Sequence, residues 1–345
     1  MPDPNSTTIL VTGARGVLGG FLARELERDG YLVLRGSRRH ESGPGFRLVD
    51  FDRPATVSAA FRDADIIVNP VVHPSLVAER TALREGHVLL SVASLSLADR
   101  LSLVGEQATH AGSGLVIVHA GLNPGLMPLV AADLLEHHPD ADRVDLAATV
   151  APLQTMGGLA FDYVWPFLTG MPRKPTAMLR FPDPVGWRHC IELGTGEEGW
   201  LGGLGMQREG HVWLTLMQRP MNALMLAVNA AGQMRRFPRW SMTPLQGRSR
   251  DDFCADPKRD WVMLSRRGEQ ICGAHIVGEG DYRVSVAATA AFLRQLIERQ
   301  DAEPGLAGVH GAERFFRLPE IEPELKARGV EIRSMQPGFR REERQ

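Results

Sequence analysis

The sequence has 345 residues, a length that suits two domains and is long for one. Hydrophobic residues make up 43% and charged residues 23%, as is typical of globular proteins, and the formal net charge of −2 excludes a strong attraction to nucleic acid or to an anionic membrane. Three widely spaced cysteines exclude a disulfide framework and a CxxC metal site, and they suit a reducing compartment.

The first part of the chain alternates short apolar runs with helical patterns. Its polar start, MPDPNSTT, is unlike a signal peptide, and no apolar run reaches about 20 residues, the length of a membrane helix, so we expect a cytoplasmic protein. Apolar runs predict buried parallel strands at 8–12, 31–34, 47–51, 64–70, 87–93 and 114–120. Apolar residues at helical spacing predict helices at 17–30, 75–85 and 97–111. This alternation predicts an α/β fold with a doubly wound parallel sheet of the Rossmann kind.

The second part has a different pattern. Alternating runs such as VDLAATVA, HVWLTLM, DWVML and AHIVGEG predict strands of a second sheet, and helices are expected at 221–235 and 285–299. We therefore expect a Rossmann domain at 1–124 and an α+β mixed-sheet domain for substrate binding or dimerisation at 125–304. Residues 305–345 are expected to pack back on the first domain and to end in a frayed, charged tail.

A glycine-rich turn, LVTGARGVLGG, joins the first predicted strand to the first predicted helix. Glycines there let the backbone approach a pyrophosphate and let the helix pack closely on the strand. Amide groups at the start of the helix would face the phosphates, whose charge the helix dipole favours. The expected cofactor-binding residues are Gly13, Ala14, Arg15, Gly16, Val17, Leu18 and Gly19. The alternative is a glycine-rich turn that binds nothing.

The segment VLRGSRRH, after the second strand, indicates which dinucleotide binds. An acidic residue at this point accepts a hydrogen bond from the ribose 2′-hydroxyl of NAD, whereas arginine accommodates the 2′-phosphate of NADP. Here Arg35, Ser37, Arg38 and Arg39 occur with no acid before Glu41. We therefore expect NADP rather than NAD, held by Ser37, Arg38 and Arg39, with a solvated basic loop as the alternative. Asp50 is expected near the adenine, and Asn69 and Pro70 along the nicotinamide side.

The glycine turn resembles that of the short-chain dehydrogenase/reductase superfamily, but the Tyr-x-x-x-Lys pair of that family is missing. Tyr31, Tyr163 and Tyr282 have no lysine four positions later. Three other segments resemble saccharopine dehydrogenase-like proteins: DADIIVNPVVHPSLVAERTALREGHVLLSVAS at 63–94, HAGLNPGLMPLVAADLL at 119–135 and GLAGVHGAERFFRLPEIEPELKARGVEI at 305–332. The second segment is similar to the crossover between the two domains of that family, and the third to its carboxyl-terminal segment.

This resemblance implies an NADP-dependent oxidoreductase that transfers hydride at a carbon–nitrogen bond, as in imine or opine chemistry, or at another unsaturated centre of a small molecule. Ser91 stands where the family often has an aspartate, and a serine cannot act as a base or carry a compensating charge. Two alternatives remain open. One is a non-catalytic NADP-binding sensor that contacts a partner protein, and the other is an atypical short-chain reductase or epimerase.

Two residues are candidates for catalysis. His73 follows the fourth predicted strand, at the carboxyl end of the sheet, where an imidazole could exchange the proton that accompanies hydride transfer. The alternative is a solvated loop histidine. Asn123, in the crossover turn, either faces the same cleft or stabilises the turn before Pro124. No metal site, nucleic acid or membrane partner is expected, and an open sheet in the second domain suggests a homodimer.

Overall fold

The computed structural model describes residues 7–39, 43–93, 95–109, 113–150, 169–195, 209–236, 257–303 and 305–335. The chain forms two compact units, one of residues 1–129 with 285–324 and one of residues 130–284 with 325–345. The predicted domain ranges 125–304 and 305–345 cut across these units. The reason is that helix α9 (Asp281–Ala302) runs from the second unit into the first, and the last strand, β14 (Glu331–Met335), pairs within the second unit.

The first unit contains a seven-stranded sheet in which every pair of neighbouring strands is parallel. Its order is β13-β6-β5-β4-β1-β2-β3, so the doubly wound order expected of a Rossmann domain carries one added strand at its edge. The strands are β1 (Thr8–Val11), β2 (Leu32–Ser37), β3 (Phe46–Leu48), β4 (Ile66–Asn69), β5 (Val88–Ser91), β6 (Leu115–Val118) and β13 (Gly308–Gly311). The predicted doubly wound parallel sheet is confirmed.

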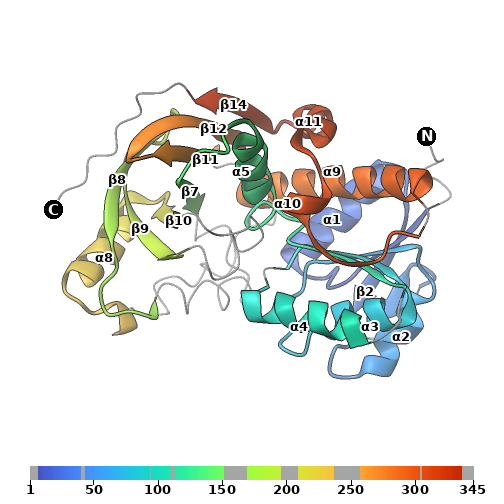
Figure 1. Ribbon diagram of the computed structural model, residues 1–345. Helices are drawn as coiled ribbons and strands as arrows, with labels where there is room; N and C mark the ends of the chain where they lie inside the picture. Colours follow the sequence, from blue (N-terminus) through green and yellow to red (C-terminus); the bar gives the residue numbers. More distant parts are fainter. Residues whose placement is uncertain are drawn as a thin grey trace. The chain divides into compact units, whose positions relative to one another are not determined.

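Helices cover both faces of this sheet. Figure 1 shows α2 (Pro54–Phe61), α3 (Val77–Glu85) and α4 (Leu97–Thr109) on one face, with α1 (Val17–Arg28) and residues 285–302 of α9 on the other. On the first of these faces, Leu10, Ile67 and Leu89 from the strands pack with Phe61 and Leu83 from the helices. Because the strands are covered on both sides, they are nearly continuous apolar runs, which is why the sequence shows them clearly.

Two strand boundaries differ from the prediction in ways that concern the binding site. β2 extends to Ser37 because its last residues pair with β3, Arg35 opposite Phe46 and Ser37 opposite Leu48. β3 ends at Leu48, so Asp50 does not end the third strand. Its carboxylate instead accepts a hydrogen bond from the backbone N–H of Asp52 (3.2 Å), as in a turn.

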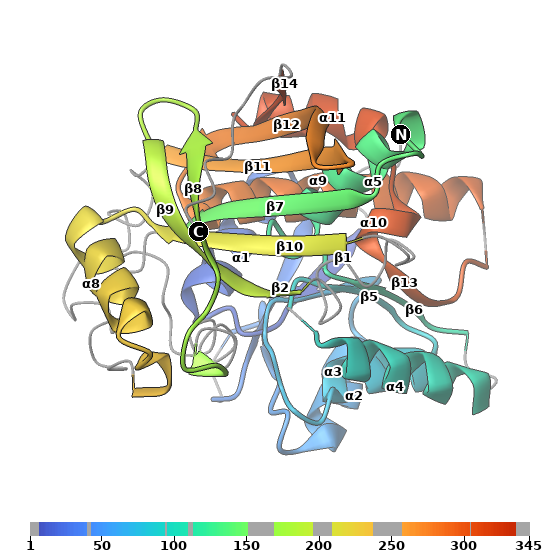
Figure 2. The same cartoon turned by 60° about the vertical axis from the view of Figure 1, so that its left-hand side comes forward.

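The second unit is built on a mixed sheet, and the predicted second α+β layer is therefore confirmed. Its order is β14-β12-β11-β7-β10-β9-β8, in which only the β7–β10 pair is parallel among the described strands. The strands are β7 (Arg143–Val150), β8 (Thr176–Phe181), β9 (Gly186–Thr195), β10 (Glu209–Leu216), β11 (Pro257–Arg266), β12 (Glu269–Glu279) and β14. Figure 2 shows β7, β10, β11 and β12 running side by side.

The remaining helices are short or amphipathic. They are α5 (Leu126–His137), α8 (Arg219–Ala230), a 3₁₀ turn (Met234–Arg236), α10 (Ala312–Phe315) and α11 (Leu318–Ala327). α8 packs on β9 and β10, where Asn222 accepts a hydrogen bond from the backbone N–H of Leu216 (3.0 Å). None of the helices in the described ranges has the length and apolar character that crossing a bilayer requires.

Candidate dinucleotide-binding site

The glycine turn lies between β1 and α1, at the carboxyl edge of the parallel sheet. Gly13 has a φ of +58°, and the N–H of Gly16 donates to the Gly13 carbonyl oxygen (2.8 Å), which closes the turn. The N–H of Ala14 donates to the carbonyl oxygen of Gly36 (3.0 Å), so the turn is also fastened to β2. The sequence therefore places this turn correctly, at the edge where open α/β sheets bind ligands.

The start of α1 is suited to an anion. Gly16 is its N-cap, no side chain caps the free amides, and the first turn contains no acidic residue. These amides and the helix dipole together favour a phosphate at this end. Arg15 and Gly16 are exposed, and Val17 and Leu18 are partly exposed, so the outer surface of the turn is open to solvent.

Gly19 explains how α1 can approach the turn so closely. A Cβ atom on this residue would lie 2.4 Å from the carbonyl oxygen of Gly13 and 2.8 Å from its carbonyl carbon, both of which are backbone atoms. A Cβ on Gly13 would lie 2.4 Å from Cγ2 of Val71, in the loop after β4. The turn is thus packed between its own helix and the β4–α3 loop.

In the basic segment VLRGSRRH, one arginine forms an ion pair within the unit and two are exposed to solvent. The guanidinium of Arg35 is held by Glu27 of α1, with Nη2 at 2.8 and 2.7 Å from the two carboxylate oxygens. Ser37 is buried, and its hydroxyl oxygen accepts a hydrogen bond from the backbone N–H of Arg39 (3.2 Å). The Arg38 and Arg39 side chains are exposed at the end of β2. Arg38, Arg39 and Ser37 therefore remain the candidates for a 2′-phosphate, while Arg35 is engaged by α1.

Asn69, expected beside the nicotinamide, is buried, and its amide is occupied by protein groups. Its Oδ1 accepts from the Thr12 hydroxyl (2.6 Å) and the Val71 N–H (3.2 Å), and its Nδ2 donates to the carbonyl oxygen of Val71 (3.2 Å). Nδ2 also donates to Oε1 of Glu79 (2.9 Å), in the first turn of α3. The adjoining Pro70 is only partly buried.

Glu79 is a functional candidate that the sequence analysis missed. Its carboxyl group is buried, and its Oε1 also accepts a hydrogen bond from the Ser91 hydroxyl (2.8 Å). Burial raises the pKa of Glu79, and nearby Asp99 raises it further. Ser91 itself carries no charge, as the sequence indicates, but the fold brings a carboxyl group next to it.

The two predicted catalytic residues lie on different loops of the first unit. His73 Nδ1 lies 2.6 Å from the Ser75 hydroxyl, its Nε2 lies 3.5 Å from Oδ1 of Asp52, and its ring meets the edge of Phe51. These contacts hold His73 against the loop that follows β3. Asn123 lies between β6 and α5, where the N–H of Leu126 donates to the Gly121 carbonyl oxygen (2.9 Å).

His119 directly follows β6, in the crossover turn whose segment HAGLNP the sequence analysis singled out. It is buried, it has a φ of +63°, and its Nε2 lies 3.2 Å from the backbone nitrogen and 3.0 Å from the backbone oxygen of Leu95. Burial lowers the pKa of His119 to about 3, and Arg100 contributes to the same shift. His119 is therefore neutral and joins the crossover turn to the loop after β5.

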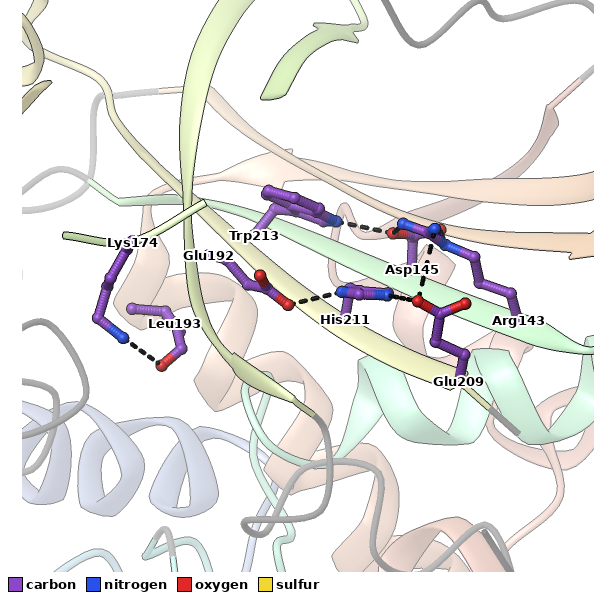
Figure 3. A network of polar contacts seen from close by, with 8 residues as sticks. All are labelled: Arg143, Asp145, Lys174, Glu192, Leu193, Glu209, His211 and Trp213. Atoms are coloured by element: carbon purple, nitrogen blue, oxygen red, sulfur yellow. Dashed lines mark hydrogen bonds and ion pairs between the residues drawn. The ribbon is translucent and has the colours of Figure 1, made fainter. Parts of the chain in front are cut away.

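A polar network crosses the sheet of the second unit (Figure 3). Asp145 accepts two hydrogen bonds from the Arg143 guanidinium (2.7 and 2.9 Å) and one from the Trp213 indole N–H (2.7 Å). The two nitrogens of His211 lie 2.6 Å from Oε1 of Glu192 and 2.7 Å from Oε1 of Glu209. The Glu192 carboxylate is the main cause of a raised pKa for His211. This unit thus holds the His211 imidazole between two carboxylates, which favour its protonated form.

In the described ranges, no three His, Cys, Asp or Glu side chains come together as metal ligands. His137, near the end of α5, has its Nδ1 2.9 Å from the Asp133 carbonyl oxygen.

Comparison with solved structures identifies the fold. Saccharopine dehydrogenase (L-Glu forming) from Saccharomyces cerevisiae is similar with a TM-score of 0.57 and 13% sequence identity, over 96% of this chain and 100% of that chain. This chain has the saccharopine dehydrogenase fold. The WlbA dehydrogenase from Thermus thermophilus is more distant, with a TM-score of 0.42 and 14% identity over 93% of each chain.

Sequence comparison finds a family match for the first part of the chain. Residues 9–114 match the model of the NAD dependent epimerase/dehydratase family, a range that begins in β1 and contains the glycine turn. A comparison with curated protein sequences finds no match. Together, the fold and this match support the prediction of an NAD(P)-dependent oxidoreductase.

Proposed function

We propose that this chain is an NADP-dependent oxidoreductase that reduces a carbon–nitrogen double bond or another unsaturated centre of a small molecule. The observation that carries the proposal is the uncapped start of α1, with its glycine turn, at the carboxyl edge of a seven-stranded parallel sheet. The saccharopine dehydrogenase fold supports the carbon–nitrogen class. Ser91, in place of the aspartate that such proteins often carry, favours a substrate other than saccharopine.

The residues present fit a dinucleotide. The amides of the turn from Gly13 to Gly19 would hold the pyrophosphate, and Arg38 with Arg39 and Ser37 would hold the 2′-phosphate through charge-assisted hydrogen bonds. NADPH supplies the hydride when it is bound. Reduction of a C=N bond places that hydride on carbon and a proton on nitrogen, and His73 is the proposed source of the proton.

The experiment that tests the cofactor preference is a titration with NADPH and with NADH, followed by nicotinamide fluorescence. We expect NADPH to bind more tightly to the wild type. Replacing both Arg38 and Arg39 with alanine should weaken NADPH binding about tenfold or more, because charge-assisted hydrogen bonds to the phosphate are lost, and should leave NADH binding unchanged. Arg62→Ala, which removes another exposed arginine of the first unit, is the matched control and should change neither affinity.

Two outcomes would contradict different parts of the proposal. Failure of the wild type to bind either nucleotide would overturn the oxidoreductase function. Equal binding of NADH and NADPH, or an equal loss of both in the double arginine variant, would overturn the preference for NADP. The substrate class is tested by NADPH oxidation with mixtures of amines and 2-oxo acids, which form imines, against a panel of activated alkenes. Oxidation with the alkene panel alone would overturn the carbon–nitrogen class.

A further inference from the structure

The buried carboxyl group of Glu79, in α3, forms hydrogen bonds at the ends of β4 and β5, close to the glycine turn. Glu79 is only 3% exposed, and no described lysine, arginine or histidine forms an ion pair with it. A buried carboxyl group without a cation lowers stability unless its hydrogen bonds compensate for the water it has lost. The burial of this carboxyl group therefore needs a reason other than stability, and its hydrogen-bond partners indicate one.

Those contacts lead directly to the glycine turn. Glu79 accepts from the Asn69 amide, and this bond fixes which way the amide faces, with Nδ2 toward α3 and Oδ1 toward Thr12 and the Val71 N–H. Val71 is held by both ends of the same amide, and its Cγ2 lies 2.4 Å from the position that a Cβ on Gly13 would occupy. A short path of contacts thus runs from the carboxyl group, through Asn69 and Val71, to the turn.

The same carboxyl group also joins three strands. Thr12 directly follows β1, Asn69 ends β4 and Ser91 ends β5, and all three side chains are buried in one network with Glu79. The network lies under the carboxyl edge of the sheet and is itself closed to solvent. Its members are therefore placed to position groups that bind a ligand and not to touch the ligand themselves.

We propose that Glu79 is a positioning residue for the pyrophosphate and nicotinamide portion of the cofactor, acting by locking the Asn69 amide and with it the Val71 loop against the glycine turn. This inference rests on the proposed function. It assigns no role to Glu79 at the adenine end, because Arg38 and Arg39 at the end of β2 are not part of the network.

The test compares two ligands. NADPH spans the whole site, whereas adenosine 2′-monophosphate carries the 2′-phosphate and the adenosine but neither the pyrophosphate nor the nicotinamide. In Glu79→Met, which fills the space but accepts no hydrogen bond, we expect NADPH binding to weaken about tenfold, as for the loss of a buried hydrogen bond. Binding of the monophosphate should stay within about twofold of the wild type, because it has no pyrophosphate group and its contacts do not depend on the Asn69 amide. Glu79→Gln keeps an acceptor oxygen and should restore most of the NADPH affinity.

Glu106→Gln is the matched control. Glu106 is a buried carboxylate on α4 that also contacts α3, through Arg80 (2.9 Å) and Arg84, but it has no contact with Asn69. This variant should lower the melting temperature without a selective loss of NADPH. If Glu79→Met does not fold, Glu79→Ser, which is small enough to admit water, carries the same test and should show the same selective loss.

The possible outcomes distinguish failure of this inference from failure of the proposed function. A wild type that binds no NADPH overturns both. A wild type that binds NADPH, with unchanged NADPH affinity in Glu79→Met, overturns the positioning role and leaves the proposed function intact. An equal loss of both ligands in Glu79→Met also overturns it, because a general loosening of the unit would then explain the result.

Discussion

Replacing Gly19 with alanine should damage both the fold and the binding site. The added Cβ would lie 2.4 Å from the Gly13 carbonyl oxygen, whereas ordinary contacts begin near 3.4 Å, so α1 or the turn must move by about 1 Å. Overpacking of this kind costs about 1–3 kcal/mol, which corresponds to a drop in melting temperature of roughly 1–4 °C for a protein of this size. Because the amides of the turn move with it, NADPH binding should weaken at least about tenfold.

Two other glycines make the comparison quantitative. A Cβ on Gly16 would lie 3.1 Å from the Gly13 carbonyl oxygen, so Gly16→Ala should have a smaller effect of the same sign. A Cβ on Gly105, in α4, would have no atom within 4 Å. Gly105→Ala should therefore raise the melting temperature by about 1 °C, through the better helix propensity of alanine, and should not change binding.

Differential scanning calorimetry and NADPH fluorescence titration measure these effects on the same samples. The expected order of melting temperatures is Gly105→Ala above wild type, then Gly16→Ala, then Gly19→Ala. A Gly19→Ala protein with the melting temperature and NADPH affinity of the wild type would refute the reasoning, because it would show that the turn can move away from α1 at no cost.

Three further predictions concern titration and burial. Since burial lowers the pKa of His119 to about 3, the unfolded chain alone takes up this proton below roughly pH 6.5, and the free energy of unfolding should fall by up to about 1.4 kcal/mol per pH unit toward pH 3. In urea titrations, the free energy of unfolding of His119→Asn should decrease less steeply between about pH 6.5 and pH 3 than that of the wild type. The pKa of His211 is raised, so the stabilisation from its charged form is complete below about pH 6.5 and is lost as the pH rises through the folded pKa. The difference in urea midpoint between the wild type and His211→Gln should therefore shrink as the pH rises above about 6.5. Asp145→Ala leaves the Arg143 guanidinium and the Trp213 indole without this acceptor and should cost about 3–5 kcal/mol in urea unfolding followed by tryptophan fluorescence, whereas an effect below about 1 kcal/mol would contradict the buried network.

The sheet of the first unit could be predicted because its signals are local. Each nearly continuous apolar run between turn residues is one buried strand, and apolar residues at a helical spacing of 3.6 appear where a helix begins. The predicted strand 87–93 contains β5 (Val88–Ser91), and the predicted helix 97–111 contains α4 (Leu97–Thr109). The errors at β2 and β3 arise from pairing between those two strands, a property of neither segment alone.

The buried network at Glu79 could not be predicted, because it depends on contacts between separate elements. In the sequence, Glu79 is an acidic residue in the first turn of a helix, where an exposed carboxylate is ordinary. It is buried because β4 and β5 are neighbours and the first turn of α3 lies over their ends, which brings Asn69 and Ser91 to the same oxygen. The separations of 10 and 12 residues run from α3 to two different strands, so no helical or strand periodicity relates these residues in the sequence.

The contact between His211 and Glu192 could not be predicted from the sequence for a different reason. The two residues lie on the antiparallel strands β10 and β9, whose register shifts between Val212 and Trp213. A slip of one residue moves every later side chain to the opposite face, so a bulge that the sequence does not mark decides which carboxylate meets the imidazole. A pattern of alternating residues therefore predicts the strands of the second unit but not the partners across them.

Several departures from ordinary local rules lie at the carboxyl edge of the first sheet. Leu76 and His119 have left-handed backbone conformations, each of which costs about 1–2 kcal/mol for a residue with a side chain. Glu79 is a buried carboxyl group without a cation, and α1 begins without a side-chain cap. All four follow the carboxyl ends of β1, β4 or β6. Such features lower stability, and these four lie at the edge where α/β sheets bind ligands, as the proposed cofactor site requires.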